Sequence, residues 1–358
     1  MGHYEGIKDE HAALFFIKNK TMKKLFLIIV GAAMFSICDN PFKKNAADHS
    51  GIITGSNDDK NSKFIIPLDS KSLICDIENN EIRQLGSFSK TMNSKSIVVN
   101  DEFICSIDSI ISVFDIKGNL LKKIHSDFKL TSLHSKNKVV YFGGKSDRYS
   151  THSGEIFAIL DLEKEDFKLE KIKIPIDIKF GKAIDDILIL NNKLLLVDNI
   201  VFPKYLLEYD ISEPKNPKHI LTKELENNGT YEHIVKGELN EDWLILLSST
   251  VGMGGSSDYI VINGKTEGYL RVHRDHGFDK ERETDIEKPR DFNDICLIDN
   301  KLYVLVDSTV YTLDLEGNIS LENMKKVFSN LSSIKKIIRT PNNEMVFIGL
   351  NNQYEKLN

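Results

Sequence analysis

Residues 290–319, RDFNDICLIDNKLYVLVDSTVYTLDLEGNI, contain the pattern that decides the fold. Runs rich in Val, Ile, Leu and Tyr are separated by turn formers at 300–301 and 307–308, which predicts the strands Asp294–Ile298, Lys301–Val306 and Thr309–Leu315. Glu-Gly-Asn then leads into a fourth strand. One four-stranded meander cannot bury both of its faces, so this sheet requires further copies packed against it.

The chain supplies such copies, because a polar turn followed by an apolar run occurs seven times. The matches begin at Lys63, Glu102, Lys138, Lys193, Asp242, Lys301 and Glu344, at steps of 39, 36, 55, 49, 59 and 43 residues. A four-stranded propeller blade takes about 40–45 residues, so the longer steps indicate insertions. The expected fold is all-β, a β-propeller of four-stranded antiparallel blades, with seven blades favoured and six as the alternative. A pair of β-sandwiches is the weaker alternative, because the spacing recurs along the whole chain.

A second landmark supports this register, since most of the third strands end near an acid. Examples are LICDI (73–77), SVFDI (112–116) and LEYDI (207–211). The clearest cases, Asp115–Asn119 and Asp314–Asn318, have the form D-x-x-G-N, which is typical of a tight hairpin. We expect 49–55 and the C-terminal hairpin 343–357 to meet in one composite blade, because closing the ring removes exposed sheet edges.

The blade spacing and the D-x-x-G-N ends resemble NHL-type and related six- to eight-bladed propellers, including bacterial propeller lipoproteins. DISEPKNPKHI at 210–220 resembles the end of LVIVD-type propeller repeats. The resemblance covers about residues 50–358 and implies the propeller architecture. Such motifs carry no particular activity with them.

The N-terminal segment predicts localisation in the cell envelope. Met22-Lys23-Lys24 precedes thirteen mainly apolar residues, 25–37, so residues 22–37 read as a signal peptide, too short for the about 20 residues of a transmembrane helix. Cys38 follows directly and resembles the lipobox cysteine of bacterial lipoproteins, which implies cleavage before Cys38 and diacylglycerol on its thiol. Ile37 and Phe35 are bulkier than that motif usually has, so a signal peptide cleaved elsewhere and an uncleaved anchor stay open.

This reading divides the chain into four parts. Residues 1–21 are interpreted as an extension upstream of a start at Met22, and residues 38–48 as the lipidated cysteine with a polar tether. Residues 49–358 form the propeller domain. The expected location is the bacterial cell envelope, with the protein anchored to the lipid bilayer through acylated Cys38 and facing the periplasm or the exterior.

Charge and cysteine usage exclude some classes of function. The net charge of −6 and the pI of about 6.0 argue against broad nucleic-acid binding through phosphate contacts. The four cysteines, at 38, 75, 105 and 296, have no C-x-x-C spacing, so no zinc or redox motif is indicated. Cys75, Cys105 and Cys296 lie in apolar strands and are interpreted as buried small hydrophobes.

Long loops on one face are the strongest functional signal in the sequence. The predicted second-to-third strand loops 143–154, 198–205 and 248–258, and an insertion at 274–291, would share one face of the ring. Their aromatic and fork-shaped polar side chains suit a glycan, a peptide carboxylate or a protein, unless they simply solvate the loops. The candidate ligand-binding residues are Lys145, Asp147, Arg148, Tyr149, His152, Phe202, Lys204 and Tyr205.

Two further motifs give weaker indications of a functional site. His273, Asp275, His276 and Asp279 have the side-chain types of a metal site, but a loop with this spacing fixes no geometry. Gly252–Ser257 lacks the Lys-Ser/Thr ending of a phosphate loop and is interpreted as a hairpin tip. No cofactor is expected.

The leading hypothesis is a non-enzymatic binding module that uses the loops of blades three to five. The first alternative is a hydrolase or lyase acting on sugars or lactones, with a metal held by inner-strand residues. The inner strands are expected near 93–99, 129–134, 184–190, 232–239, 292–298 and 333–339, and they offer Asp185, Asp186, His233, Glu238 and Asp294. The second alternative is a structural subunit of an envelope complex that contacts its partner through the side of the propeller.

Overall fold

The computed structural model describes residues 62–90, 94–145, 156–172, 184–198, 204–225, 231–252, 255–263, 268–272, 292–316, 319 and 323–357. All of them belong to one compact unit, His49–Asn358, whereas the unit Met1–Asp48 lies outside the described residues. In the described ranges, regular structure consists of β-strands, and no helix long and apolar enough to span a bilayer is found.

The strands form seven antiparallel sheets, which we number in chain order. The first three are β1 (Lys63–Pro67), β2 (Ser72–Glu78), β3 (Glu81–Phe88); β4 (Lys95–Val99), β5 (Phe103–Ile107), β6 (Ile111–Asp115), β7 (Leu120–Ile124); and β8 (Lys129–Lys136), β9 (Val139–Lys145), β10 (Phe157–Asp161), β11 (Leu169–Lys171). The fourth and fifth are β12 (Ile184–Leu190), β13 (Lys193–Asp198), β14 (Lys204–Asp210), β15 (Lys218–Leu225); and β16 (Tyr231–Leu239), β17 (Leu244–Gly252), β18 (Gly255–Asn263), β19 (Gly268–Val272). The sixth and seventh are β20 (Phe292–Ile298), β21 (Lys301–Val306), β22 (Thr309–Asp314), β23 (Lys325–Lys326); and β24 (Ile334–Arg339), β25 (Met345–Gly349), β26 (Tyr354–Lys356).

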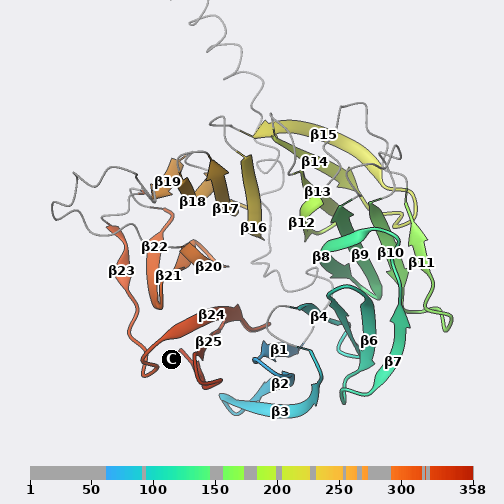
Figure 1. The fold of residues 1–358 in the computed structure, drawn as a ribbon, viewed down its shortest axis with the longest axis horizontal. Coiled ribbons are helices and arrows are strands. Elements are labelled where there is room, and N and C mark those ends of the chain that lie inside the picture. The colour runs from blue at the N-terminus through green and yellow to red at the C-terminus, as the bar shows by residue number, and fades with distance from the viewer. Residues whose placement is uncertain are drawn as a thin grey trace, which may run out of the picture. The chain divides into compact units, whose positions relative to one another are not determined.

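These sheets follow one another around a ring (Figure 1). Consecutive inner strands contact each other in the series β4, β8, β12, β16, β20 and β24, and β1 of the first sheet contacts β4. The all-β propeller fold is therefore confirmed. Five sheets have the four strands of a complete blade, and the first and seventh have three in the described residues, so the number of blades stays a prediction. The expected closing strand at 49–55 lies outside the described residues.

The seven predicted apolar runs are confirmed as strands β1, β5, β9, β13, β17, β21 and β25. Residues 290–319 differ from the prediction at the ends of two strands. Strand β20 begins two residues earlier than predicted, because Phe292 pairs with Val306 across a bulge, and β22 ends at Asp314. The fourth strand of this sheet, β23, is only two residues long.

Two of the predicted loops are partly strand. Backbone pairing between β17 and β18 continues from Ser248 opposite Tyr259 to Gly252 opposite Gly255, so most of 248–258 is an extended hairpin. Likewise β9 runs to Lys145, which pairs with Lys129. The prediction of a long loop at 248–258 was wrong, because its small and polar residues continue the backbone ladder up to the tip at Gly252 and Gly255. For 143–154 the residues after Lys145 lie outside the described ranges, so this loop stays a prediction.

The hairpin turns follow the polar pairs in the sequence. Asn79 and Asn80 between β2 and β3 have φ of 53° and 68°, and Asn100 and Asp101 between β4 and β5 have φ of 50° and 54°. Asn and Asp tolerate this left-handed region better than other non-glycine residues do. The short turns therefore fix the pairing register of each blade.

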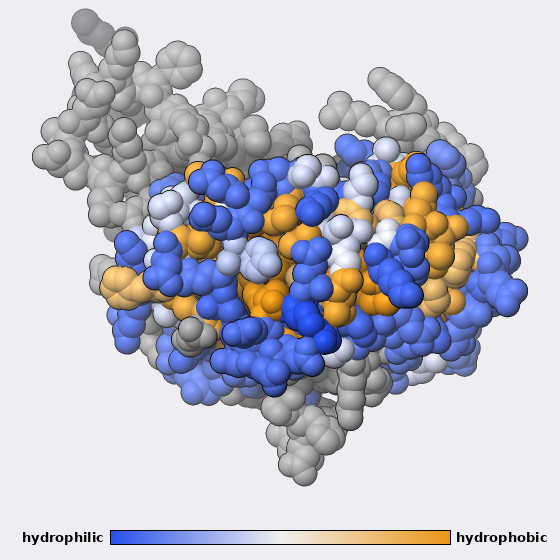
Figure 2. Space-filling view, turned by 90° about the horizontal axis from the view of Figure 1, so that it is seen from below, coloured by the Kyte–Doolittle hydropathy of each residue, from blue (hydrophilic) through white to orange (hydrophobic). Residues whose placement is uncertain are grey.

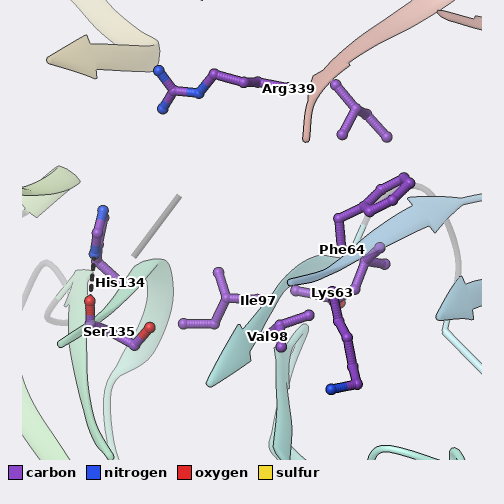
Figure 3. A pocket seen from close by; sticks show the side chains of 10 residues that line it. Lys63, Phe64, Ile97, Val98, His134, Ser135 and Arg339 are labelled. Atoms are coloured by element: carbon purple, nitrogen blue, oxygen red, sulfur yellow. Dashed lines mark hydrogen bonds between the residues drawn. The ribbon is translucent and has the colours of Figure 1, made fainter. Parts of the chain in front are cut away.

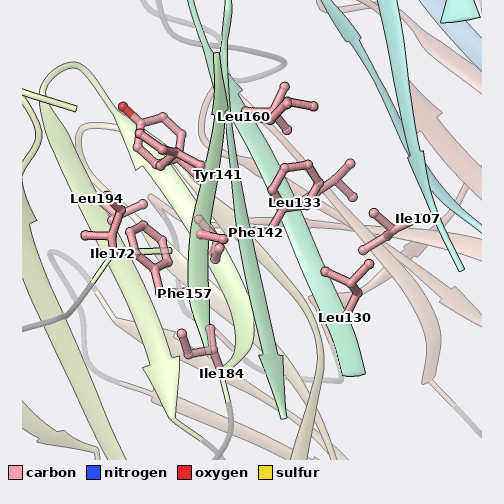
Figure 4. Close-up of a cluster of buried hydrophobic side chains, with 14 of the residues drawn as sticks. Ile107, Leu130, Leu133, Tyr141, Phe142, Phe157, Leu160, Ile172, Ile184 and Leu194 are labelled. Atoms are coloured by element: carbon pink, nitrogen blue, oxygen red, sulfur yellow. The ribbon is translucent and has the colours of Figure 1, made fainter. Parts of the chain in front are cut away.

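Apolar side chains between the sheets form the core. The largest cluster joins the second, third and fourth sheets and includes Tyr141, Phe142 and Phe157, each fully buried (Figure 4). A separate cluster joins the first sheet to the seventh, where Phe64 and Ile66 share a group with Ile348. This second cluster brings the two ends of the described chain together.

The three cysteines in the described ranges are buried and free, which confirms their interpretation as small hydrophobes. Burial raises the pKa of Cys75, with a smaller contribution from Asp76, and raises that of Cys296, to about 12 in each case. These thiols therefore stay protonated at neutral pH.

Large apolar side chains are also exposed away from the core. They include Leu120 and Leu121 on β7, Phe328, Leu350 and Tyr354. In the view of Figure 2, apolar residues gather between hydrophilic ones on the rim of the ring. No described contact shows what covers them.

Candidate functional site at the centre of the ring

Five inner strands share a bulge at the same position. The pairing register skips one residue between Leu130 and Ser132, Ile184 and Asp186, Ile234 and Lys236, Phe292 and Asp294, and Ile334 and Lys336. A bulge re-aims the side chains beside it. We call the residue after each bulge the post-bulge residue; from the third to the seventh sheet these are Ser132, Asp186, Lys236, Asp294 and Lys336.

The two post-bulge aspartates make equivalent contacts. In β12, Asp186 accepts hydrogen bonds from Ile187 N at 3.0 Å and from Gly237 N of the next sheet at 2.7 Å. In β20, Asp294 accepts from Ile295 N at 2.9 Å and from Ile337 N of the next sheet at 3.1 Å. Both carboxylates therefore join neighbouring inner strands. Burial raises the pKa of Asp186, despite the opposing charge of Lys95.

Asp185, inside the bulge of β12, has a related role. Its Oδ2 accepts a hydrogen bond from Ile234 N at 2.9 Å, and its Oδ1 lies 3.5 Å from the Lys145 ammonium. The side chain of Asp185 is 5% exposed. Lys145, a predicted ligand-binding residue, is thus directed at a buried carboxylate of its own chain.

Lys236 is the centre of an ion-pair network. Its Nζ lies 2.9 Å from Asp294 Oδ1 and 3.1 Å from Glu238 Oε1, and it also donates to the carbonyl of Ile295. Burial disfavours the ammonium, but the charges of Asp294 and Glu238 outweigh it and raise the pKa of Lys236. Lys236 therefore remains charged and paired.

Arg339, on β24, reaches across to two other sheets. Its Nη1 donates to Leu297 O at 2.8 Å, and its Nη2 lies 3.7 Å from Glu238. The side chain is 7% exposed, and its Nε is buried without a hydrogen-bond partner. A buried guanidinium nitrogen without an acceptor is uncommon and calls for an explanation.

Lys336 is the post-bulge residue of β24 and makes no hydrogen bond or ion pair with a described residue, in contrast to Lys236. Burial lowers its pKa, and the charges of Lys236 and Lys95 add to this effect against the attraction of Asp294. Lys95, at the start of β4, is exposed. The side of the ring centre next to β24 and β4 therefore carries cationic charge without a matched carboxylate among the described residues.

Next to this charge lies a cavity of about 190 Å³, which we call the central pocket. It is lined by residues 63–65 of β1, 96–98 of β4, 134–135 of β8 and 338–339 of β24. Figure 3 shows Arg339 and His134 on two sides of the opening and Phe64 and Ile97 on the other two. The Lys63 side chain extends away from Arg339, and its ammonium lies 3.4 Å from Asp101.

His134 presents a neutral imidazole to this pocket. The pKa of His134 is lowered to about 4, mainly by burial and to a smaller extent by the charge of Arg339, while the contact of Nδ1 with the carbonyl of Ser135, at 3.0 Å, opposes the shift. A neutral imidazole can donate or accept a hydrogen bond.

The inner-strand prediction located this site in part. Asp185, Asp186, Glu238 and Asp294 all lie on the predicted inner strands, but Asp185, Asp186 and Asp294 bind backbone N–H groups and Glu238 pairs with Lys236 and Arg339. For His233 only the backbone, in β16, is described. Within the described ranges, no cluster of three metal-ligating side chains was found.

Sequence reasoning missed the cations Lys95, Lys236, Lys336 and Arg339. A signal for two of them was present, because Ile-x-Lys at 234–236 and at 334–336 occupies the same place relative to the following turn. The equivalence of these two Ile-x-Lys segments is recognised only from the structure, which shows a bulge at the same place in both strands.

Most of the predicted loop site is not described. Asp147, Arg148, Tyr149, His152 and Phe202 lie outside the described residues, as do Cys38 and the predicted metal residues His273, Asp275, His276 and Asp279. Lys204 begins β14, and its side chain is not described. Tyr205 is partly buried and packs against the large core cluster.

No protein-family profile and no curated protein matches the chain. Solved structures with a similar fold include the N-terminal domain of Nup159, at 7% identity and a TM-score of 0.48, covering 82% of this chain and 85% of that one. The extracellular domain of BT4673 from B. thetaiotaomicron, provisionally assigned to a one-component system, has 12% identity and a TM-score of 0.48, covering 82% of this chain and 38% of that one.

A provisionally assigned 6-phosphogluconolactonase from Bacteroides uniformis has 9% identity and a TM-score of 0.45, covering 74% of this chain and 79% of that one. At these values the similarities carry no functional argument.

Proposed function

We propose that this chain is a non-enzymatic binding module of the bacterial cell envelope. Its ligand is a glycan, peptide or protein that inserts a group into the central pocket, whose lining residues 134–135 and 338–339 lie near the ends of β8 and β24. The loops of the third to fifth sheets are proposed as a second contact surface at the opposite edge of the ring, where Lys145 pairs with Lys129 at the start of β8. The observation that carries the proposal is the pocket itself, which is lined by four sheets of one ring and combines apolar walls with His134 and Arg339. Pockets with apolar walls and a few fixed polar groups are the usual form of a ligand site.

The contacts of the inner-strand acids favour binding over catalysis. A general base or a metal ligand needs a carboxylate oxygen directed at the substrate or ion. The oxygens of Asp186 and Asp294 instead accept one N–H from the next residue of their own strand and one from the adjacent inner strand. These acids therefore hold the ring together, which supports a rigid binding scaffold.

The location in the proposal rests on the sequence of the N-terminal segment. The basic start, the short apolar run 25–37 and Cys38 support export and acylation. We expect radiolabelled palmitate to enter the wild type and to be absent from Cys38→Ala. An unlabelled wild type would remove the lipid anchor from the proposal without affecting the pocket.

The binding role is tested by a thermal-shift screen of the chain. It is run with EDTA, with Ca²⁺ or Zn²⁺, and with a panel of neutral and charged glycans and peptides. A ligand at a hundred times its Kd stabilises the folded state by about 2.7 kcal/mol. We expect stabilisation by one class of glycan or peptide and no effect of EDTA.

Two outcomes would contradict this proposal. A Tm that falls in EDTA and is restored by one metal would favour the metal-dependent hydrolase or lyase. No response to any small ligand would point to a protein partner, and a partner that co-purifies with loop mutants but not with rim mutants would establish the structural subunit instead of the binding module.

A further inference from the structure

The inference below rests on the proposed function and concerns the chemical class of the ligand. It starts from the two post-bulge lysines, which occupy the same position in β16 and β24. Lys236 contacts two carboxylates, Asp294 and Glu238. Lys336 contacts none among the described residues, although burial disfavours its charged form. An ammonium held in a half-buried position without a carboxylate is costly unless something else pairs with it.

The charges at the ring centre do not balance in the described residues. The cations are Lys95, Lys145, Lys236, Lys336 and Arg339, and the carboxylates are Asp185, Asp186, Glu238 and Asp294. Lys145 lies beside Asp185, and Lys236 and Arg339 lie beside Glu238. The excess is a single positive charge, on the side of Lys336 and Lys95.

This excess adjoins the central pocket. The side chain of Ile337 packs with Cys296 and Leu305 of the sixth sheet, whereas that of Ile338 packs against the cluster of the first and seventh sheets. Side chains alternate along a strand, so Lys336 shares the face of the pocket-lining Ile338. Lys95 directly precedes the pocket-lining Ser96. The partnerless Nε of Arg339 belongs to a third cation that lines the pocket.

We propose that the central pocket binds a small monocarboxylate, the size of a single sugar acid, whose carboxylate pairs with Lys336 while its body lies against Phe64, Ile97 and Ile338. One excess positive charge matches a monoanion, whereas a phosphate dianion would overcompensate it next to Asp186, Asp294 and Glu238. The volume of about 190 Å³ is below the 300–1,000 Å³ of drug-sized sites and therefore fits a small ligand.

The test uses the full chain and isothermal titration with glucuronate, glucose and inorganic phosphate. We expect glucuronate to bind the wild type, glucose not to bind, and phosphate to bind more weakly than glucuronate. In Lys336→Met the affinity for glucuronate falls at least tenfold. The matched control is Lys335→Met on the same strand, because the Lys335 ammonium is already paired with Asp69; the affinity of this variant stays at the wild-type value.

A second readout needs no ligand. Because Lys336 lacks a carboxylate partner, Lys336→Met is expected to raise the Tm of the free protein, as removal of an unpaired binding-site charge commonly does. A lower Tm would mean that Lys336 stabilises the fold, and would overturn the inference.

The remaining outcomes separate the inference from the proposed function. Equal binding of glucuronate and glucose, tighter binding of phosphate, or unchanged affinity in Lys336→Met each overturns the carboxylate assignment. If a neutral glycan or peptide from the panel binds and glucuronate does not, the carboxylate inference fails and the binding module stands. If nothing in the panel binds, the carboxylate inference fails and the binding module is reduced to a protein ligand.

Discussion

At the scale of single residues, His134 couples stability to pH. The unfolded chain binds a proton on this imidazole near pH 6.5, whereas the folded chain binds it only near pH 4. As the pH falls from 6.5 to 4, the unfolded state gains a proton that the folded state lacks, so the free energy of unfolding decreases, by up to about 3 kcal/mol.

We therefore predict that His134→Gln makes the free energy of unfolding less dependent on pH between 6.5 and 4. Urea denaturation of wild type and variant at several pH values measures the difference, in which the carboxylates common to both proteins cancel. Parallel pH profiles would show that His134 is not held neutral in the folded protein.

The two post-bulge aspartates allow a comparison at equivalent positions. Asp294→Ala leaves Ile295 N and Ile337 N without acceptors and removes one of the two carboxylates from Lys236. Asp186→Ala removes the same two kinds of backbone contact but no ion pair of this kind.

We predict that Asp294→Ala lowers the free energy of unfolding by about 3–5 kcal/mol, because it breaks a buried ion pair. For Asp186→Ala the loss is smaller, about 1–3 kcal/mol, since it leaves unpaired N–H groups only. Urea denaturation at pH 7 decides the order. A larger loss for Asp186→Ala would mean that the ion pair contributes nothing net.

At the scale of elements, the D-x-x-G-N turn between β6 and β7 shows why the motif needs its glycine. Asp115 Oδ1 accepts hydrogen bonds from Lys117 N at 2.9 Å and Asn119 N at 2.8 Å. Gly118 has a φ of +91°, and a Cβ there would lie 2.1 Å from the carbonyl oxygen of Ser87 in the first sheet. The turn thus serves both its own hairpin and the contact with the neighbouring sheet.

Gly118→Ala is expected to lower the free energy of unfolding by about 2 kcal/mol or more, from the disfavoured φ and the contact with Ser87. Lys117→Ala, one residue away with an exposed side chain, serves as control and should change it by less than about 0.5 kcal/mol. Thermal and urea denaturation check both variants. Equal stability of the two would refute the role given to the glycine.

At the scale of the whole molecule, the ring depends on the contact between the first and seventh sheets. Val346 and Ile348 of β25 pack in one cluster with Phe64, Ile66 and Leu73 of the first sheet. Lys335 donates to Asp69 at 2.8 Å across the same junction, over a sequence separation of 266 residues. Contacts of this separation close the ring.

We predict that Ile348→Ala costs about 2–5 kcal/mol, because it leaves a cavity at the junction. The single tryptophan, Trp243, is buried between the fifth and sixth sheets and reports from another part of the ring. The unfolding transitions followed by tryptophan fluorescence and by far-UV circular dichroism should both move to the same lower midpoint. Leu350→Ala, at a side chain that is 60% exposed, should leave both unchanged. Separate midpoints for the two probes would mean that the sheets unfold independently.

The sequence alone determined the fold class and the approximate position of each strand. Those signals are local: apolar alternation marks the strands, and Asn or Asp at positive φ marks turns such as Asn79–Asn80 and Asn100–Asp101. It also located the inner strands, and with them the acids at the centre. The length of the loops was harder to predict from the sequence, because Ser248–Gly252 continues a strand with residues that also suit a loop.

Only the tertiary structure decided which of these residues meet. The pair Lys236 and Asp294 is separated by 58 residues, and the contact of Arg339 with Leu297 by 42. Such pairs arise because ring closure brings inner strands side by side and a shared bulge turns the post-bulge side chains toward each other. The same arrangement leaves Lys336 without a described partner. A composition in which cations and acids nearly balance gives no indication of that local excess, because charge balance at a site depends on geometry.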